Sequence, residues 1–390
     1  ARPQDFAPEA VLGAATRRAG LEDFGERSFI EGLRVFLDSL ILSPQLHAFG
    51  RVYARQMVVA MLTHRLKLTE LLKTRPELLE QPISRPVFVL GLPRSGTSLL
   101  FNLLARDRAH RCMHNWESFI GQVPPKGRYT FATDPRRGQA KWVLRIQKYL
   151  MPEIDTQHEF LADGPEECTP ILMQGFATQA FAGGFDVPAY ARWLDGADHV
   201  PTYQHHKRVL QALQWKYPGE RWLLKSPDHV AAVDAILRVY PDACFVHIHR
   251  DPVKAVSSWA SLNQTYRGVY YQRVDRDALG EQVLTRLAND MRRCLEDRSR
   301  HGGEQFVDVR FGDLMQHPVE VVREIYAKFG FPLDAATESA MRAFLAENPM
   351  HKHGVHRYEP EDFGLSAATI RQRFAEYIDT FKVPPGRPAG

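Results

Sequence analysis

The chain has 390 residues, of which 44% are hydrophobic and 25% charged, a composition typical of a globular protein. Its 50 basic and 46 acidic side chains leave a formal net charge of only +4, which argues against a nucleic-acid-binding protein driven by bulk charge. The four cysteines form no C-x-x-C pair, and no apolar run approaches the roughly 20 residues of a membrane-spanning helix. We therefore expect a cytoplasmic protein without a zinc site, a disulfide framework, a transmembrane segment or a nucleic-acid partner.

Residues 1–84 are predicted to form a helical arm. Phe29, Leu33, Leu37 and Leu40 recur at helical spacing, and a second long helix is expected from Leu46 to Leu72. Such an amphipathic arm packs against the body of the protein, caps the active site or forms a dimer contact. We expect the boundary to a second unit, residues 85–390, at the prolines that follow the arm.

The stretch from Pro86 to Leu100 organises the rest of the chain. An apolar run over Val87–Leu90 predicts a buried strand, Gly91–Gly96 a tight loop, and the following residues a helix. This order presents backbone N–H groups to a phosphate. The loop nearly matches the P-loop pattern G-x-x-x-x-G-K-[ST], but Thr97 stands in place of the lysine and Arg94 lies inside the loop. The loop therefore suits a phosphate-like anion better than ordinary NTP hydrolysis.

Residues 107–220 form an irregular insertion with a helix predicted over Gln139–Leu150 and a turn at Asp163–Glu167. Aromatic residues are frequent in it: Trp116, Phe119, Tyr129, Phe131, Trp142, Tyr149, Phe160, Phe176, Phe181, Phe185, Tyr190 and Trp193. They either form an apolar acceptor-binding pocket or fill a core, and the sequence leaves both interpretations open.

Three further strands are predicted, over residues 221–225, 243–250 and 305–311, each followed by a helix. Asp251-Pro252 is a helix start, with Asp251 as the cap. Strands alternating with helices predict an α/β fold with a mainly parallel, P-loop-like sheet flanked by helices. Ligands of such sheets bind at the carboxyl ends of the strands.

A second anion site is predicted after the third of these four strands. Arg250 ends that strand, and Ser258 follows eight residues later in the next helix. A guanidinium and a hydroxyl beside one helix start can hold a phosphate. Two anion sites on neighbouring strand ends suggest a nucleoside with phosphates at both ends.

These residues resemble those of the sulfotransferases that use 3′-phosphoadenosine 5′-phosphosulfate (PAPS), in particular a bacterial branch related to the tyrosylprotein-type enzymes. The segment 93–98, Pro-Arg-Ser-Gly-Thr-Ser, resembles their 5′-phosphosulfate loop, and Arg250-Asp-Pro-x5-Ser258 resembles their 3′-phosphate motif. Leu224–His229 is similar to the lysine-bearing segment of the family, and 352–358 to a C-terminal segment that closes over the cofactor. The resemblance covers residues 85 to 365.

The resemblance implies a role for each matching residue. Lys225 contacts the bridging oxygen and the sulfonate in transfer, and Arg250 and Ser258 hold the 3′-phosphate. The 5′-phosphate is held by Arg94, Ser95, Gly96, Thr97 and Ser98, and the closing segment 345–390 adds Lys352, Gly354, Arg357 and Tyr358. The family requires no metal, so we expect PAPS as the donor and 3′-phosphoadenosine 5′-phosphate as the product.

A general base is needed to accept the proton of the acceptor hydroxyl. Glu117 is the first candidate, because it lies just past the helix after the loop, where related enzymes place a catalytic glutamate, and because Trp116 and Phe119 supply apolar surroundings. His158 and His229 are the alternatives, since an imidazole titrates near neutral pH.

The sequence thus predicts a bacterial, cytoplasmic PAPS-dependent sulfotransferase that modifies a hydroxyl of a small apolar or lipid-like acceptor, as a monomer or a homodimer. A P-loop nucleotide kinase or NTPase is one alternative. A non-catalytic nucleotide-binding protein of the same fold is another.

Overall fold

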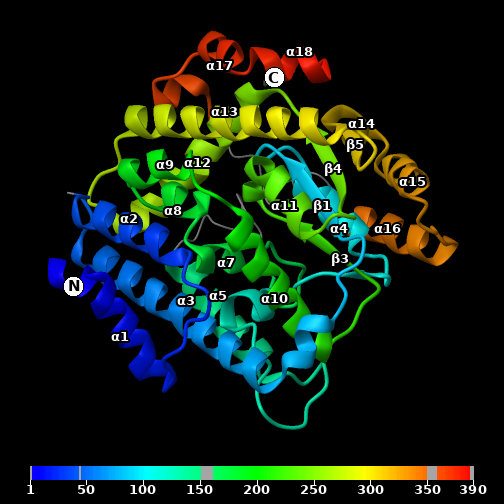
Figure 1. Cartoon of the computed structure of the whole chain (residues 1–390). Helices are drawn as coiled ribbons and strands as arrows, with labels where there is room; N and C mark the ends of the chain where they lie inside the picture. The colour runs from blue at the N-terminus through cyan, green and yellow to red at the C-terminus, as the bar shows by residue number, and fades with distance from the viewer. Residues whose placement is uncertain (1, 44, 151–160, 349–357, 387–390) are drawn as a thin grey trace.

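The computed structural model describes residues 2–43, 45–150, 161–348 and 358–386 (Figure 1). Its sheet has five parallel strands: β1 (Val87–Gly91), β2 (His110–Arg111), β3 (Arg221–Lys225), β4 (Cys244–His249) and β5 (Phe306–Arg310). Their spatial order is β2-β3-β1-β4-β5. The predicted α/β fold with a parallel sheet is confirmed, and the structure adds the short edge strand β2.

Helices cover both faces of the sheet because alternate residues of each strand point to opposite sides. Phe88 and Leu90 belong to a core shared with α10 (Val200–Lys216), α11 (Val233–Val239), α12 (Pro252–Tyr270) and α13 (Arg276–His301). Val87 and Val89 belong to a core on the other face, shared with α4 (Thr97–Leu104), α15 (Pro318–Phe329) and α16 (Ala335–Glu347). Both faces of β1 are buried, as a central parallel strand requires.

The N-terminal helices pack onto part of the insertion rather than standing apart (lower left of Figure 1). They are α1 (Pro8–Ala19), α2 (Phe29–Ile41) and α3 (Ala48–Thr74), and their partners are α8 (Gln179–Gly184) and α9 (Pro188–Leu194). Phe36 stacks on Phe181 with ring centroids 4.1 Å apart. Several aromatic residues of the insertion, including Phe176 and Tyr190, therefore fill this core.

The remaining elements are short, except for α5 with 16 residues. They are η1 (Pro3–Phe6), η2 (Pro76–Glu80), η3 (Trp116–Ile120), α5 (Pro135–Leu150), α7 (Thr169–Leu172), η4 (Met173–Gly175), η5 (Pro227–Ala232), α14 (Phe311–Gln316), η6 (Pro360–Phe363), α17 (Ala367–Arg373) and α18 (Ala375–Phe381). Among the described residues, no helix combines the length and apolar character needed to cross a bilayer.

The C-terminal helices lie on the outer side of α13 (top of Figure 1) and contact the residues that follow β4. The backbone N–H of Arg250 donates to the Tyr377 hydroxyl at 3.2 Å. The Asp251 carboxylate caps α12 at Val253 N, 3.1 Å, and also accepts from Arg371 at 3.2 Å and Gly386 N at 2.5 Å. The C-terminal segment therefore fixes the turn between β4 and α12.

We predict that Gly280→Ala destabilises the fold by about 1–3 kcal/mol, because a Cβ on Gly280 in α13 would lie 2.1 Å from the Phe363 carbonyl oxygen. Gly268 in α12 is the matched control, since a Cβ there meets no atom within 4 Å. Gly268→Ala should be neutral or slightly stabilising. Urea unfolding of both variants tests this, and equal stability of the two would contradict the close approach.

Candidate active site

The loop after β1 turns sharply into α4. Arg94 has a φ of 65° and Gly96 a φ of 91°, both in the left-handed region. A Cβ on Gly91 would lie 2.5 Å from the Ser95 hydroxyl oxygen and 2.9 Å from the Ile248 carbonyl oxygen, so only glycine fits there. The first N–H groups of α4 have no carbonyl one turn earlier to bond to. The loop thus presents them at the carboxyl end of the sheet, which is an anion-binding arrangement.

Arg94 and Arg250, one from each predicted anion motif, meet at this edge. Arg250 donates from its guanidinium to the Arg94 carbonyl oxygen, and Arg94 Nε donates to the Ser258 hydroxyl at 3.3 Å. The Arg250 guanidinium lies 4.1 Å from the centroid of the Phe311 ring. Burial, together with the nearby Arg94 cation, lowers the pKa of Arg250. The structure therefore joins the two motifs into one cationic site.

A cavity of about 270 Å³ opens over the loop. It is lined by Val89, Gly91, Pro93, Arg94, Gly96, Thr97, Ser98, Leu99, Glu167, Lys225, Ser226, Pro227, Arg250, Trp259, Leu262, Phe311, Met315 and Tyr358. These described residues include three basic side chains and one acidic one, so the lining carries a net charge of about +2. The Leu99, Trp259 and Leu262 side chains give part of the wall an apolar character.

Lys225 projects from the end of β3 and is buried. Its ammonium donates to Ser98 Oγ at 3.3 Å and forms a close ion pair with Glu167. Glu167 reaches this position because the N–H of the next residue, Cys168, donates to the Lys225 carbonyl oxygen at 2.9 Å. Sequence reasoning treated Glu167 only as part of a turn. The sequence did contain one sign of a functional role for Glu167: it lies next to a second acid, Glu166, just before a helix.

Glu166 lies beside this pair and is buried. Its carboxylate accepts from Asn115 Nδ2 at 2.8 Å and from the backbone N–H of Glu167 at 2.9 Å. Burial raises the pKa of Glu166 to about 7, and these two hydrogen bonds offset only part of that effect. Two adjacent carboxyl groups thus lie in different environments.

The structure does not bring Glu117 into the cavity. Its side chain is fully buried, forms an ion pair with Arg111 and accepts from the backbone N–H of His114 at 3.0 Å. Arg111, six residues earlier on β2, holds the carboxylate inside the protein. Two aromatic residues were expected to surround the Glu117 carboxylate with apolar atoms. Of these, Trp116 is buried and Phe119 is 46% exposed.

The alternative bases are placed differently. His229 is buried in the core, with Nδ1 2.7 Å from the Tyr203 hydroxyl, and burial lowers its pKa well below the usual range. It does not line the cavity, because it belongs to η5 and its ring packs against Phe88 in the core. His158 lies outside the described residues.

The other predicted donor contacts fall into three groups. Gly96, Thr97, Ser98 and Tyr358 line the cavity. Ser95 lies under the loop with its side chain buried, and its N–H donates to the Leu92 carbonyl at 3.2 Å, so it closes the loop. Lys352, Gly354 and Arg357 lie outside the described residues.

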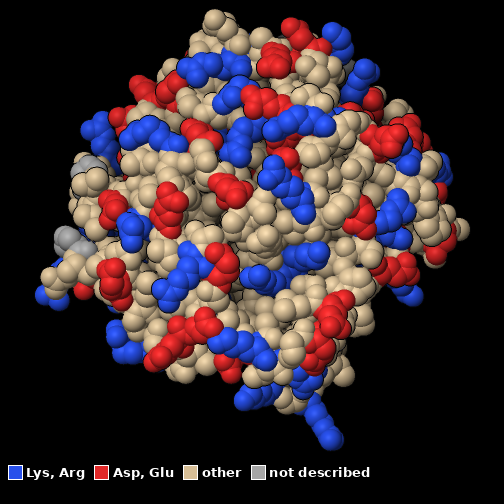
Figure 2. Space-filling view, viewed as in Figure 1, with Lys and Arg blue, Asp and Glu red and all other residues tan. Residues whose placement is uncertain are grey.

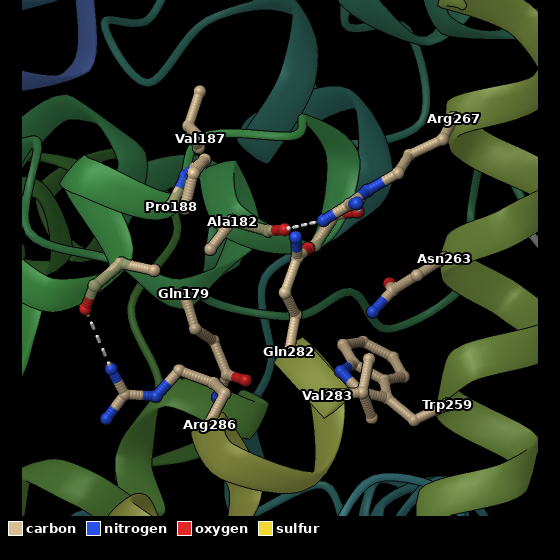
Figure 3. Close-up of a pocket in the computed structure, with 12 residues that line it drawn as sticks. Gln179, Ala182, Val187, Pro188, Trp259, Asn263, Arg267, Gln282, Val283 and Arg286 are labelled. Atoms are coloured by element: carbon tan, nitrogen blue, oxygen red, sulfur yellow. Dashed lines mark hydrogen bonds between the residues drawn. The ribbon is translucent and has the colours of Figure 1, made fainter. Parts of the chain in front are cut away.

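Within the described ranges, the aromatic side chains at the cavity come from Trp259, Phe311 and Tyr358, after the insertion. For the aromatic residues of 107–220 the sequence left a pocket and a core open. Phe176, Phe181, Phe185 and Tyr190 fill a core, whereas Phe119, Phe131, Trp142 and Tyr149 are exposed. Trp259 also lines a second, smaller cavity of about 30 Å³ between α8, α9, α12 and α13 (Figure 3). That space holds about one water molecule, and Arg267 beside it donates to the Ala182 carbonyl at 2.7 Å.

Of the described side chains, one set has the spacing of metal ligands: His247, His249 and Asp308. A cation already occupies this cluster, because Arg298 donates to both Asp308 oxygens at 2.7 and 2.9 Å and contacts His247 Nδ1 at 3.0 Å. The cluster therefore serves as a structural ion-pair network beside β4 and β5.

Three comparisons place the chain among known proteins. A model of the sulfotransferase family matches residues 86–335. A relative from Mycobacterium bovis, named omega-hydroxy-beta-dihydromenaquinone-9 sulfotransferase Stf3, is 25% identical over 306 residues, which is 76% of this chain and 74% of the relative.

Two crystal structures resemble this one along nearly its whole length. Sulfotransferase STF1 from Mycobacterium tuberculosis is 30% identical with a TM-score of 0.84, covering 94% of this chain and 98% of the other. Sulfotransferase STF9 from Mycobacterium avium is 32% identical with a TM-score of 0.85, covering 96% and 97%. The anion loop, the second arginine motif, the parallel sheet and these similarities agree, and the chain belongs to the sulfotransferase family.

Proposed function

We propose that this enzyme transfers the sulfuryl group of PAPS to a hydroxyl of an apolar, lipid-like small molecule. The observation that carries the proposal is the cavity in which Arg94, Lys225 and Arg250 converge on one loop while Glu167 faces the same space. Three cations around bare N–H groups suit a donor with charge at two positions better than a neutral ligand.

The residues present fit the donor. Thr97 and Ser98 at the start of α4 and the Arg94 guanidinium are suited to the 5′-phosphate. Arg250 and Ser258 are suited to the 3′-phosphate, and the contacts of Tyr377 and Asp251 hold that turn in place. PAPS, when bound, supplies a sulfuryl group whose bond to the 5′-phosphate oxygen breaks as the acceptor oxygen bonds to sulfur.

Lys225 and Glu167 are the proposed chemical pair. Lys225 neutralises charge that develops on the leaving phosphate, because its ammonium lies beside Ser98 at the phosphate end of the cavity. Glu167 accepts the proton of the acceptor hydroxyl and takes the role first expected of Glu117. An anionic donor competes for Lys225 and so releases the Glu167 carboxylate for this task.

Glu166 supports this assignment. A carboxyl group whose pKa lies near 7 holds its proton at neutral pH more readily than an ordinary glutamate. Glu166, which is buried beside the cavity and does not line it, then adds less negative charge next to Glu167 than an ordinary glutamate would. Environments that separate two carboxyl groups in this way are a common means of dividing acid and base roles.

The acceptor class is inferred from the apolar wall and from a relative. Leu99, Trp259, Leu262 and Met315 line the cavity, and Tyr266 on α12 lies close enough to Glu167 for that carboxylate, after burial, to raise its pKa. The Stf3 relative carries the name of a sulfotransferase for a hydroxylated menaquinone. Both favour an apolar hydroxyl compound here.

We also propose a reducing, cytoplasmic location. The four cysteines, Cys112, Cys168, Cys244 and Cys294, are all buried and unpaired. Thiols kept apart in this way are typical of cytoplasmic proteins.

We predict that calorimetry shows tighter binding of 3′-phosphoadenosine 5′-phosphate than of ATP with Mg²⁺. Arg250→Ala should weaken binding of the diphosphate by about 2 kcal/mol, roughly 30-fold, because a charged phosphate contact is lost. Arg292→Ala, on the exposed side of α13, is the control and should leave affinity unchanged. Preference for ATP, or unchanged affinity of Arg250→Ala, would contradict the assignment of the donor.

Glu167→Gln should lower the turnover of radiolabelled PAPS with a lipid extract by about 100-fold or more, since removing a general base costs 10²–10⁴ in rate. Its affinity for the diphosphate should change only a few-fold. Lys225→Ala should likewise reduce kcat more than binding.

Glu117→Gln is the comparison variant for this experiment. It breaks a buried ion pair and should lower stability while each folded molecule keeps its turnover rate. Normal rates in Glu167→Gln, together with lost rates in folded Glu117→Gln, would return the base role to Glu117.

The stability of the protein should depend on pH through Glu166. Its pKa is raised in the folded state, so the folded protein keeps a proton that the unfolded chain releases between pH 4.5 and about 7. This group therefore makes the fold less stable as pH rises through that window. Glu166→Gln should stabilise the protein at pH 8 by up to about 3 kcal/mol and much less at pH 4.5.

Urea unfolding at both pH values measures this difference. Glu304→Gln, at an exposed position, is the control and should show the same stability change at both. An equal effect of Glu166→Gln at pH 4.5 and pH 8 would contradict the proposed protonation.

A further inference from the structure

Helix α5 exposes an apolar face. Trp142, Ile146 and Tyr149 are spaced four and three residues apart, so they share one side of the helix, and they are 65%, 39% and 87% exposed. Val143, beside them, is 40% exposed. The opposite side of α5 is packed against the protein through Ala140 and Leu144. Large aromatic side chains are seldom this exposed without a partner.

The same helix carries charge of a single sign. Residues 135–150 contain five basic side chains and no acidic one. Lys141, Arg145 and Lys148 are exposed and recur at spacings of four and three residues, along one flank of the apolar face. By contrast, basic and acidic side chains are interspersed over the face of the molecule shown in Figure 2.

Exposed aromatic side chains also occur on the segments next to α5. α5 packs against η3, which contributes Phe119, 46% exposed. Phe131, in the loop before α5, is 37% exposed and lies under the Arg137 guanidinium, 5.6 Å from the ring centroid. Aromatic side chains beside basic ones are the composition of helices that lie in a membrane interface.

α5 is also tied to the active site. Arg137 and Lys141 form ion pairs with Asp163 at 2.9 and 3.7 Å, and His114 contacts the carbonyl of the same residue at 3.0 Å. Asp163 begins the short turn that ends at Glu167 in the cavity. A partner bound to the exposed face of α5 would therefore lie near the turn 163–167, which carries the proposed base Glu167.

We propose that α5 docks the enzyme on a bilayer that contains anionic phospholipid. Trp142, Ile146 and Tyr149 enter the headgroup boundary while Lys141, Arg145 and Lys148 contact lipid phosphates. The docking itself does not require the proposed reaction; its purpose, delivery of a membrane-resident hydroxyl acceptor to the cavity, rests on the proposed function.

A bilayer fits this face better than a second copy of the chain. A two-fold pairing of α5 with α5 would place the basic flanks of both helices near one another, and Asp163, which pairs with Arg137 and Lys141, offsets only part of that charge. Anionic lipid supplies that opposite charge.

Sedimentation with vesicles tests the proposal. The full chain should bind vesicles of phosphatidylglycerol and phosphatidylcholine, and binding should weaken at high salt and with phosphatidylcholine alone. Trp142→Glu/Tyr149→Glu should weaken binding at least tenfold, and Lys141→Glu/Arg145→Glu should remove its salt dependence. Trp215→Glu on α10, another exposed tryptophan at 39%, is the control and should bind as the unaltered chain does.

Three other results would each contradict the membrane docking of α5. Absence of binding to anionic vesicles, or equal loss in the Trp215→Glu control, would overturn the proposal. So would a dimer in sedimentation velocity that only the α5 variants dissociate, because α5 would then be a subunit interface. The variants should retain diphosphate affinity. If vesicle binding holds while the unaltered chain transfers no sulfuryl group to any extract, the proposed function is wrong and the docking stands.

Discussion

The site depends on holding Arg94, Lys225 and Arg250 together at one edge of a parallel sheet, where they repel one another. Parallel pairing makes this unavoidable, because the ends of β1, β3 and β4 lie side by side. Glu167 is the only acidic side chain among the described residues of the cavity lining. It balances Lys225 but leaves a positive excess, and a ligand with two anionic groups is what would complete the charge balance.

Several contacts outside the cavity hold one of its three basic side chains, Arg250, in position. Arg250 uses its guanidinium to close the loop at the Arg94 carbonyl, and its backbone is fixed by Tyr377 on a helix 127 residues away. Asp251 caps α12 and collects contacts from Arg371 and Gly386. The C-terminal helices thus support the cationic site, although none of their described residues lines the cavity. The N-terminal helices, as far as the structure describes them, do not contribute to the cavity lining; they form a separate core with α8 and α9 of the insertion.

Features that depend on short sequence patterns, namely the strands and the two anion motifs, could be predicted from the sequence. Apolar runs, the glycines of the loop and the arginine-to-serine spacing predict the sheet and the two anion motifs, because each is encoded within a short stretch of sequence. Glu117 was predicted as the base from its distance along the chain. The structure places it in an ion pair with Arg111, outside the cavity lining, and we propose Glu167 in its place. Glu167 reaches the cavity through a backbone hydrogen bond between Cys168 and Lys225, 57 residues apart, and no local pattern encodes that pairing.

The exposed face of α5 and the apolar cavity wall both agree with the proposal of an enzyme that takes its acceptor from lipid and holds its donor with Arg94, Lys225 and Arg250. A crystal structure with 3′-phosphoadenosine 5′-phosphate bound tests the central claim most directly. We expect the 5′-phosphate on Arg94 and the start of α4, the 3′-phosphate on Arg250 and Ser258, and Glu167 facing the space beyond the 5′-phosphate. A nucleotide bound elsewhere, or one whose 5′-phosphate points away from both Lys225 and Glu167, would contradict it.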